Sequence, residues 1–240
     1  ILISFRINNL WLIRITVISL FFFGIYNSKI TWQALNDKLR SLTRLYFSLS
    51  IKEKIVMVIL AFSVFNLLLC SLGPPTDADS LDYHLGVPIL WLTDFNNFPN
   101  IDWLHSRLVG IGEVINYIGL VCGTDILGQL IQYSGLWIIF LSLLKFTYGA
   151  NQRILLALLI FSVPLNIWLV STQKPLLFPS AVMIAGFCIY IQQKNSFNPF
   201  YHTVASLFIL YSIACKYSFI IPGSIMILFG LWCAYKNKNI

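Results

Sequence analysis

Long apolar runs with very few charges between them constrain this chain more than any other feature. Of its 240 residues, 58% are hydrophobic and 10% are charged, and the mean hydropathy is +0.79. Soluble domains carry roughly 25% charged residues, so a soluble enzyme, a secreted disulfide scaffold and a disordered tail are excluded. The runs do not alternate as the strands of a transmembrane barrel would. The sequence therefore predicts an all-α, polytopic helical membrane protein, in which each helix satisfies its own backbone hydrogen bonds.

Seven of these runs approach the length of about 20 residues that a helix needs to cross a bilayer. They cover residues 10–26, 55–72, 126–148, 154–170, 176–193, 200–215 and 219–235. We therefore expect about seven transmembrane helices. Residues 1–54 form an N-terminal span and a basic cytoplasmic connector, and residues 55–240 form the transmembrane core. Because the chain begins without Met and ends abruptly, we also expect it to be a fragment of a longer membrane protein.

The charges are segregated along the chain. Seven of the nine acidic residues lie between Asp77 and Asp125, where Arg107 is the one basic residue, so this window has a formal charge of −6. The rest of the chain has a formal charge of +13, but its basic residues are scattered between apolar runs. That scatter excludes a nucleic-acid interface, which would need a basic patch. The pattern indicates a basic membrane scaffold with a single acidic insert.

The positive-inside rule places this insert. Residues 29–54 hold six Lys and Arg and are expected in the cytoplasm. Residues 108–121 are apolar, but the stretch has fourteen residues and contains Glu113, whose charge would be costly in the middle of a bilayer. If this stretch does not cross, five of the seven basic residues outside residues 1–54 and the insert lie on the cytoplasmic side. Residues 73–125 are therefore predicted to form one external loop with juxtamembrane or re-entrant helices.

The start of this loop is a candidate catalytic site. A helix beginning near Asp79 would place Asp79, Asp82 and Tyr83 on one face, with Asp77 just before it. Crowded carboxylates repel one another, which raises the pKa of at least one and suits a general base. Alternatively, these acids solvate the loop and cap a helix. Asp77 and Asp79 could also hold Mg²⁺ or Mn²⁺, although the sequence identifies no third ligand.

The candidates for substrate binding are charged or titratable residues: Asp82, Tyr83, His84, His105, Arg107, Glu113, Lys174 and Lys216. The two histidines are structural or catalytic. Arg107 binds a phosphate or offsets its acidic neighbours. Glu113 is a functional candidate because an unpaired carboxylate in an apolar helix is expensive. The two lysines either extend to the membrane interface or face an anionic lipid head group such as a polyprenyl phosphate.

Several short motifs resemble those of a known superfamily. The stretch PPTDADSLDYHL at residues 74–85, with Pro88 and Trp91-Leu92, resembles the first external loop of GT-C type membrane glycosyltransferases. The likeness is to bacterial members related to the dolichyl-phosphate-mannose protein mannosyltransferases and the lipid A aminoarabinose transferases. The same pattern continues in His105-Ser106-Arg107, Gly112-Glu113, Gly123-Thr124-Asp125 and Cys215-Lys216-Tyr217. The resemblance covers about residues 55–235.

This resemblance implies a reaction. The donor would be a sugar on a polyprenyl phosphate or diphosphate, and the acceptor a hydroxyl of a lipid, glycan or protein. Asp79 matches the catalytic aspartate best, with Asp77 as second choice, and would deprotonate or orient the acceptor hydroxyl as it attacks the anomeric carbon with inversion. Arg107, Lys174 and Lys216 would hold the donor phosphate, which leaves as an anion.

Two other classes of function remain open. One is a transporter or flippase of lipid-linked sugars, and the other is a non-catalytic membrane subunit in which the acids only shape a loop. Transporters usually show inverted repeats and helices broken at mid-membrane, and the sequence shows neither plainly. In each case we expect a multi-pass integral membrane protein, in a bacterial inner membrane, with membrane lipids around it.

Overall fold

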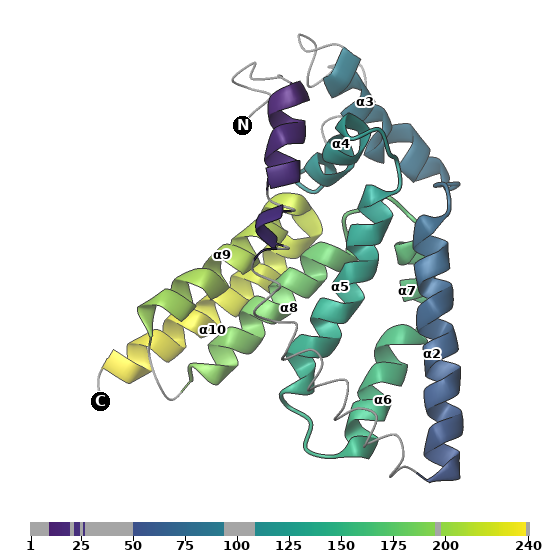
Figure 1. Cartoon of the computed structure of the whole chain (residues 1–240). Coiled ribbons are helices and arrows are strands. Elements are labelled where there is room, and N and C mark those ends of the chain that lie inside the picture. Colours follow the sequence, from purple (N-terminus) through teal and green to yellow (C-terminus); the bar gives the residue numbers. More distant parts are fainter. Residues whose placement is uncertain are drawn as a thin grey trace. The chain divides into compact units, whose positions relative to one another are not determined.

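The computed structural model describes residues 10–19, 22–24, 26, 50–93, 109–194 and 198–238. Within these residues all regular structure is helical (Figure 1), so the all-α part of the predicted fold class is confirmed. The chain divides into two compact units, Ile1–Phe62 and Ser63–Ile240. Every described residue of the candidate site belongs to the second unit. The helices are α2 (Ile51–Leu72), η1 (Ser80–His84), α3 (Gly86–Thr93), α4 (Glu113–Val121), α5 (Leu127–Leu144), α6 (Ala150–Phe161), α7 (Pro164–Val170), α8 (Leu177–Gln192), α9 (Pro199–Cys215), η3 (Tyr217–Phe219) and α10 (Ile220–Lys238).

In the first unit, residues 10–19, 22–24 and 26 are helical, as the first apolar run predicts. The predicted helix in the basic connector, at residues 31–47, lies outside the described residues. Helix α2 begins directly after Ser50. The Glu53 carboxylate accepts hydrogen bonds from the Ser50 backbone N–H at 2.8 Å and the Ser50 hydroxyl at 2.7 Å, and the Glu53 N–H donates to Ser50 Oγ at 3.4 Å. This reciprocal capping explains why the helix starts at Ile51.

Among the described residues, three helical segments are long and apolar enough to cross a membrane: Ile51–Leu72, Leu127–Leu144 and Tyr217–Asn237. Helices α6 and α7 make a fourth if they count as one span, but a break between them bends the pair by 55°. Helices α8 and α9 are apolar and shorter, with 16 and 17 residues. Several apolar helices of this kind are typical of a membrane protein.

The break between α6 and α7 differs from the single helix predicted at residues 154–170. Val163 is extended and Pro164 occupies the first position of α7. Proline lacks an amide hydrogen and restricts the preceding residue to extended conformations, so it ends one helix and starts the next. The Asn166 side chain donates to the Ile160 carbonyl at 2.7 Å, which satisfies a backbone group at the end of α6.

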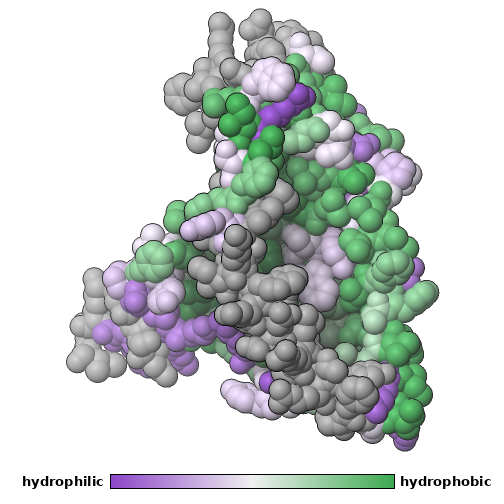
Figure 2. All heavy atoms as spheres, in the orientation of Figure 1, coloured by the Kyte–Doolittle hydropathy of each residue, from purple (hydrophilic) through white to green (hydrophobic). Residues whose placement is uncertain are grey.

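In the second unit, α8 packs against both α5 and α9, and α10 lies along α9 (Figure 1). Ser212 on α9 donates to the Pro179 carbonyl on α8 at 2.7 Å. The core here contains Met183, Tyr190, Ala205, Ile209 and Phe219. Outside it, large apolar side chains remain exposed, and Figure 2 shows them over much of one face of the molecule. Such apolar outer surfaces are expected where helices face lipid.

Candidate functional site

The acidic insert begins with a tight helical turn. Asp77 Oδ1 accepts a hydrogen bond from the Ser80 backbone N–H at 3.0 Å. The Leu85 N–H then donates to the Ser80 carbonyl at 2.9 Å, the five-residue spacing of a π-helix, so η1 is wider than the α-helix predicted here. Asp79 stands at the position just before η1. Such π-turns are rare and are found frequently at functional sites.

A distant segment is anchored to this turn through buried polar groups. The Gln173 N–H donates to the buried Ser80 hydroxyl at 2.8 Å. The Asn116 side-chain amide, on α4, donates to the His84 carbonyl at 2.9 Å and to the Gln173 carbonyl at 3.0 Å. Unpaired carbonyls would be costly in such a buried place. Asn116 therefore ties η1, α4 and the segment before α8 together.

Helix α5 holds the other side of this segment. The buried Gln129 amide donates to the Ser171 carbonyl at 2.7 Å. Gln132 Oε1 accepts from the Phe178 N–H at 3.0 Å. Glutamine side chains in an apolar helix need partners, and here they fix both ends of residues 171–178, the segment that carries Lys174.

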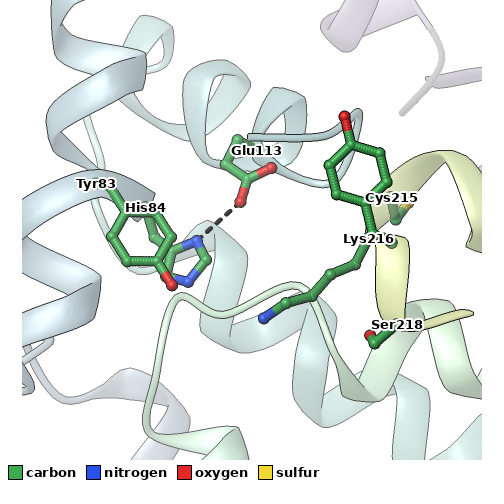
Figure 3. Close-up of a pocket in the computed structure, with 7 residues that line it drawn as sticks. Tyr83, His84, Glu113, Cys215, Lys216 and Ser218 are labelled. Carbon is green, nitrogen blue, oxygen red and sulfur yellow. Dashed lines mark hydrogen bonds and ion pairs between the residues drawn. The ribbon is translucent and has the colours of Figure 1, made fainter. Parts of the chain in front are cut away.

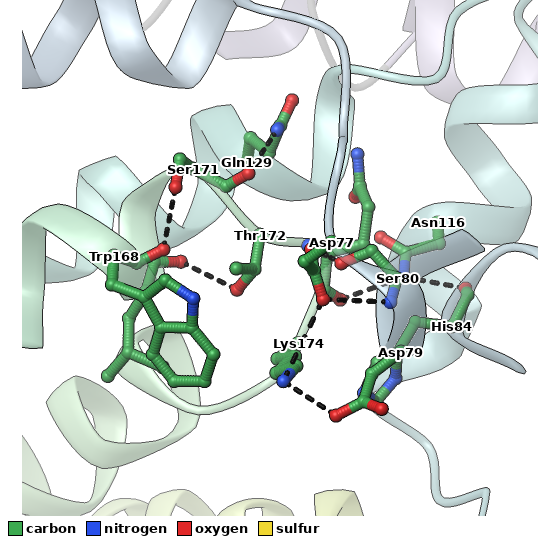
Figure 4. Close-up of polar contacts among 12 residues, drawn as sticks. Asp77, Asp79, Ser80, His84, Asn116, Gln129, Trp168, Ser171, Thr172 and Lys174 are labelled. Carbon is green, nitrogen blue, oxygen red and sulfur yellow. Dashed lines mark hydrogen bonds and ion pairs between the residues drawn. The ribbon is translucent and has the colours of Figure 1, made fainter. Parts of the chain in front are cut away.

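Lys174 joins this segment to the acidic insert by an ion pair. Its Nζ lies 2.7 Å from Asp79 Oδ2 and 3.7 Å from Asp77 Oδ1 (Figure 4). The same ammonium lies 4.2 Å from the centre of the Trp168 ring, on α7. Lys174 is 8% exposed, so it does not extend into water as an interface lysine would. The side chain of Asp79 is 54% exposed, which leaves this carboxylate accessible to a ligand.

The predicted metal site does not fit this arrangement. Lys174 already supplies the positive charge between the two aspartates. Within the described residues, no group of three or more His, Cys, Asp or Glu side chains could hold a metal ion. Asp77 and Asp79 are therefore better described as partners of an ammonium group than as cation ligands.

A second pair lies next to this one along η1. His84 Nδ1 is 2.8 Å from Glu113 Oε1 (Figure 3), and both side chains are buried. The second oxygen of Glu113 accepts from the Gly110 N–H at 3.1 Å. The Glu113 carboxyl group thus contacts the His84 ring through one oxygen and a backbone amide through the other, which fixes the orientation of both side chains.

His84 and Glu113 line a cavity of about 220 Å³ (Figure 3). Its other lining residues are Tyr83, Cys215, Lys216, Tyr217 and Ser218. Burial lowers the pKa of Lys216, although Glu113 and Asp79 partly oppose this effect. Burial also raises the pKa of Tyr83, and the nearby carboxylates add to that rise, Asp79 first among them. The cavity therefore joins one lysine, two phenols and the His84–Glu113 pair.

Two glycines allow the residues before α4 to lie close to the end of α9 and to Pro175. The Ile111 N–H donates to the Ala214 carbonyl at the end of α9, at 3.1 Å. A Cβ atom on Gly110 would lie 2.2 Å from the Cys215 carbonyl oxygen, and one on Gly112 would lie 2.4 Å from Pro175 Cβ. Backbone approaches this close require glycine. The residues before α4 thus pack directly onto the segment that carries Lys216.

The predicted site residues have different outcomes. The structure brings Asp77 and Asp79 to Lys174, and Tyr83, His84 and Glu113 to Lys216. Asp82 is exposed on η1. His105 and Arg107 lie outside the described residues. Sequence reasoning missed the polar residues that hold the site together. The available signal was the presence of Gln and Asn in or beside apolar runs. These polar residues are Ser80, Asn116, Gln129, Gln132 and Gln173.

Comparison with known proteins gives a family. No curated protein and no solved structure matches the sequence. A family model described as the DUF1420 N-terminal domain matches residues 27–235. This match includes both ion pairs, the cavity and all the helices from α2 to α9. Because it covers most of the chain, the protein belongs to the DUF1420 family and consists largely of that family's N-terminal domain.

Proposed function

We propose that the protein is a GT-C type membrane glycosyltransferase. It moves a sugar from a polyprenyl phosphate or diphosphate donor to a hydroxyl acceptor, with Asp79 as the base. In this proposal it is a multi-pass protein of about seven spans in a bacterial inner membrane, and residues 73–125 form an external loop. One observation supports it above all. The exposed carboxylate of Asp79 lies 2.7 Å from a buried lysine, Lys174, that is brought in from beyond α7.

The chemistry follows from this pair. Lys174 Nζ contacts Oδ2 of Asp79 and keeps the carboxylate oriented. The acceptor hydroxyl donates its hydrogen to Asp79 as its oxygen attacks the anomeric carbon. The new carbon–oxygen bond forms while the bond from that carbon to the phosphate oxygen breaks. The proton goes to Asp79, and the electron pair leaves with the phosphate.

The leaving phosphate needs positive charge near it. Lys174 is close enough to Lys216 that its positive charge adds to the lowering of the Lys216 pKa, which is caused mainly by burial. In the proposed reaction they stabilise the departing anion, with Arg107 as a further candidate. A buried ammonium interacts more strongly with an anion than one in water, because the surrounding dielectric constant is lower.

One observation favours a second candidate, a flippase of lipid-linked sugars. The α6–α7 pair is bent by 55° at its break, and helices broken within the membrane are common in transporters. A flippase would move the lipid-linked sugar across the bilayer without cleaving it. The two candidates therefore differ in whether the bond between sugar and phosphate survives.

The test is to reconstitute the purified chain in liposomes with polyprenyl-phosphate-linked sugars and a membrane extract as the source of acceptors. Mass spectrometry then follows intact donor and free polyprenyl phosphate. A glycosyltransferase releases free polyprenyl phosphate only when acceptor is present. A flippase makes the intact donor accessible on the opposite leaflet without release, and that result would replace the proposed function with the alternative.

A further inference from the structure

Among the described residues, one ring nitrogen of His84, which lines the cavity, has no hydrogen-bond partner. Within the part of the chain that the structure describes, His84 Nε2 is buried and has no hydrogen bond. The whole side chain is 1% exposed. Its other nitrogen is fixed by Glu113 at 2.8 Å, and its backbone carbonyl is held by Asn116. A buried polar atom without a hydrogen-bond partner destabilises the folded chain. A ligand that hydrogen-bonds to this nitrogen would remove that cost.

The fixed contact decides what this nitrogen offers. Since Nδ1 is held by Glu113, Nε2 is the ring nitrogen that can form a hydrogen bond with a ligand in the cavity. The charged and titratable groups facing it are Tyr83 on η1, Glu113 on α4, and Cys215, Lys216 and Tyr217 at the end of α9 and the start of η3. Glu113 is already paired with His84 and Gly110. The cavity therefore offers Nε2 of His84 and the donor group of Lys216, beside the hydroxyl groups of Tyr83, Tyr217 and Ser218.

We propose that this cavity binds a sugar hydroxyl, which donates to His84 Nε2 and accepts from Lys216 Nζ. A hydroxyl is both donor and acceptor, so it matches the two groups together. The aromatic rings of Tyr83 and Tyr217 line the same cavity and supply the apolar surface that a sugar ring covers. Glu113 is the positioning residue, because it sets the orientation of the imidazole.

This inference rests on the proposed function only where it assigns the hydroxyl to the donor sugar. It makes the cavity the place where sugars are distinguished. A site that pairs a hydroxyl through buried groups strongly rejects an analogue that lacks it, because both groups are then left unpaired. Asp79, by contrast, acts at the bond that is broken.

The test is nitrogen NMR of the full chain with ¹⁵N-labelled histidine, in lipid nanodiscs. The probes are octyl glucoside, octyl mannoside and octyl galactoside, with dodecyl phosphate as the anionic comparison. We expect at least one sugar probe to shift the unprotonated Nε2 signal of His84. We expect His84→Leu and Lys216→Met each to weaken binding of that probe by about tenfold. His202→Gln, which changes a buried histidine on α9, should leave the binding unchanged.

Two results would overturn the inference. One is dodecyl phosphate, and no sugar probe, converting His84 to the doubly protonated form, which would identify an anion site. The other is no response of His84 to any probe while the same preparation releases polyprenyl phosphate; this leaves the proposed function standing. If His84→Leu does not fold, Glu113→Gln replaces it. That variant keeps an acceptor for Nδ1 and should keep the sugar-induced shift, whereas its loss in a folded Glu113→Gln chain contradicts the positioning role.

Discussion

Lys174 Nζ lies 2.7 Å from Asp79 Oδ2, although the two residues are 95 positions apart in the chain. The contact is made because Gln173 binds Ser80 and Asn116 binds both Gln173 and His84. A buried ammonium requires a charged partner. The acidic insert and the segment before α8 therefore depend on each other for a stable site.

The pair of Asp79 and Lys174 should show measurable coupling. We expect a double-mutant cycle of Asp79→Asn and Lys174→Met to give about 1 kcal/mol in unfolding free energy, because the exposure of Asp79 weakens the ion pair. Denaturant unfolding in micelles measures it. Asp125→Asn combined with Lys174→Met is the control, because Asp125 contacts Gln173 through its backbone carbonyl. Additive effects for Asp79 and Lys174 would contradict a direct interaction.

Ser80 should matter for stability through one backbone group. Ser80→Ala leaves the Gln173 N–H without its acceptor in a buried place, which costs about 1–3 kcal/mol. Thermal unfolding should show a clear decrease in Tm. Ser134→Ala is a matched control, because the Ser134 hydroxyl only donates to a carbonyl of its own helix. Equal decreases in Tm for the two variants would mean that the hydrogen bond between Ser80 and Gln173 adds nothing to stability.

Gly110 should not tolerate a methyl group. In Gly110→Ala the added carbon would meet the Cys215 carbonyl at 2.2 Å, so the residues before α4 must move away from α9. We expect a loss of about 1–3 kcal/mol in stability and a change in the environment of Lys216. Gly149→Ala, where nothing lies within 4 Å of the added carbon, should be neutral. A stable Gly110→Ala chain with unchanged cavity binding would contradict the close packing.

The pH dependence of stability should report the burial of Lys216. Its pKa is lowered in the folded chain, mainly by burial, so the unfolded chain binds more protons between that pKa and the ordinary lysine value of about 10.4. Stability from this group therefore rises with pH across that window. Lys216→Met should remove this rise of stability with pH. It should also make the chain more stable at neutral pH, because the cost of burying the lysine charge is then absent.

The raised pKa of Tyr83 has the opposite sign, since it makes stability fall as the pH passes the ordinary tyrosine value of about 10. Comparing the wild type with Lys216→Met at each pH cancels that contribution, because Tyr83 is present in both. The measurement is Tm from pH 7 to pH 10. A difference between the two chains that stays constant with pH would contradict the burial of Lys216.

Sidedness can be tested with single cysteines. The exposed positions Ala78 and Cys122 lie one in each of the two described parts of the acidic insert, and Asn151 is exposed at the start of α6. If residues 73–125 form one external loop, an impermeant reagent labels cysteine at the first two positions in intact cells and not at Asn151. Labelling of positions 78 and 122 from opposite sides would mean that the insert crosses the membrane. Helix α4 alone, with nine residues, is about 14 Å long, too short for the hydrocarbon core of about 30 Å.

Composition and charge predicted the helical fold class and the acidic insert, because both are properties of long stretches. Asp77 and Asp79 were identifiable as members of the acidic insert, and Lys174 as a lone cation between two apolar runs. Their pairing was not, since it depends on Asn116 and Gln173 meeting across the fold. Pro164 indicates a helix break in the sequence, because proline ends a helix. The continuous apolar run around it led instead to the prediction of a single helix at residues 154–170.

The seven predicted spans and the π-turn of η1 show the same limit of prediction from a single sequence. Hydropathy located α8 and α9 to within one residue at each end, but with 16 and 17 residues these helices are shorter than the about 20 residues of a typical span. The wider turn of η1 arises from contacts of Ser80 with Asp77 and Gln173. Tertiary hydrogen bonds of this kind leave no periodic signal in a single sequence.

Asp79→Asn tests the central claim most directly. In liposomes with polyprenyl-phosphate-linked sugar and acceptor, the release of polyprenyl phosphate is compared for the wild type, Asp79→Asn and Asp125→Asn. Asparagine preserves the size of the side chain but cannot accept the proton, so we predict a loss of at least about a hundredfold for Asp79→Asn. Asp125→Asn should retain the wild-type rate. Equal release by Asp79→Asn and the wild type would contradict a glycosyltransferase with Asp79 as its base.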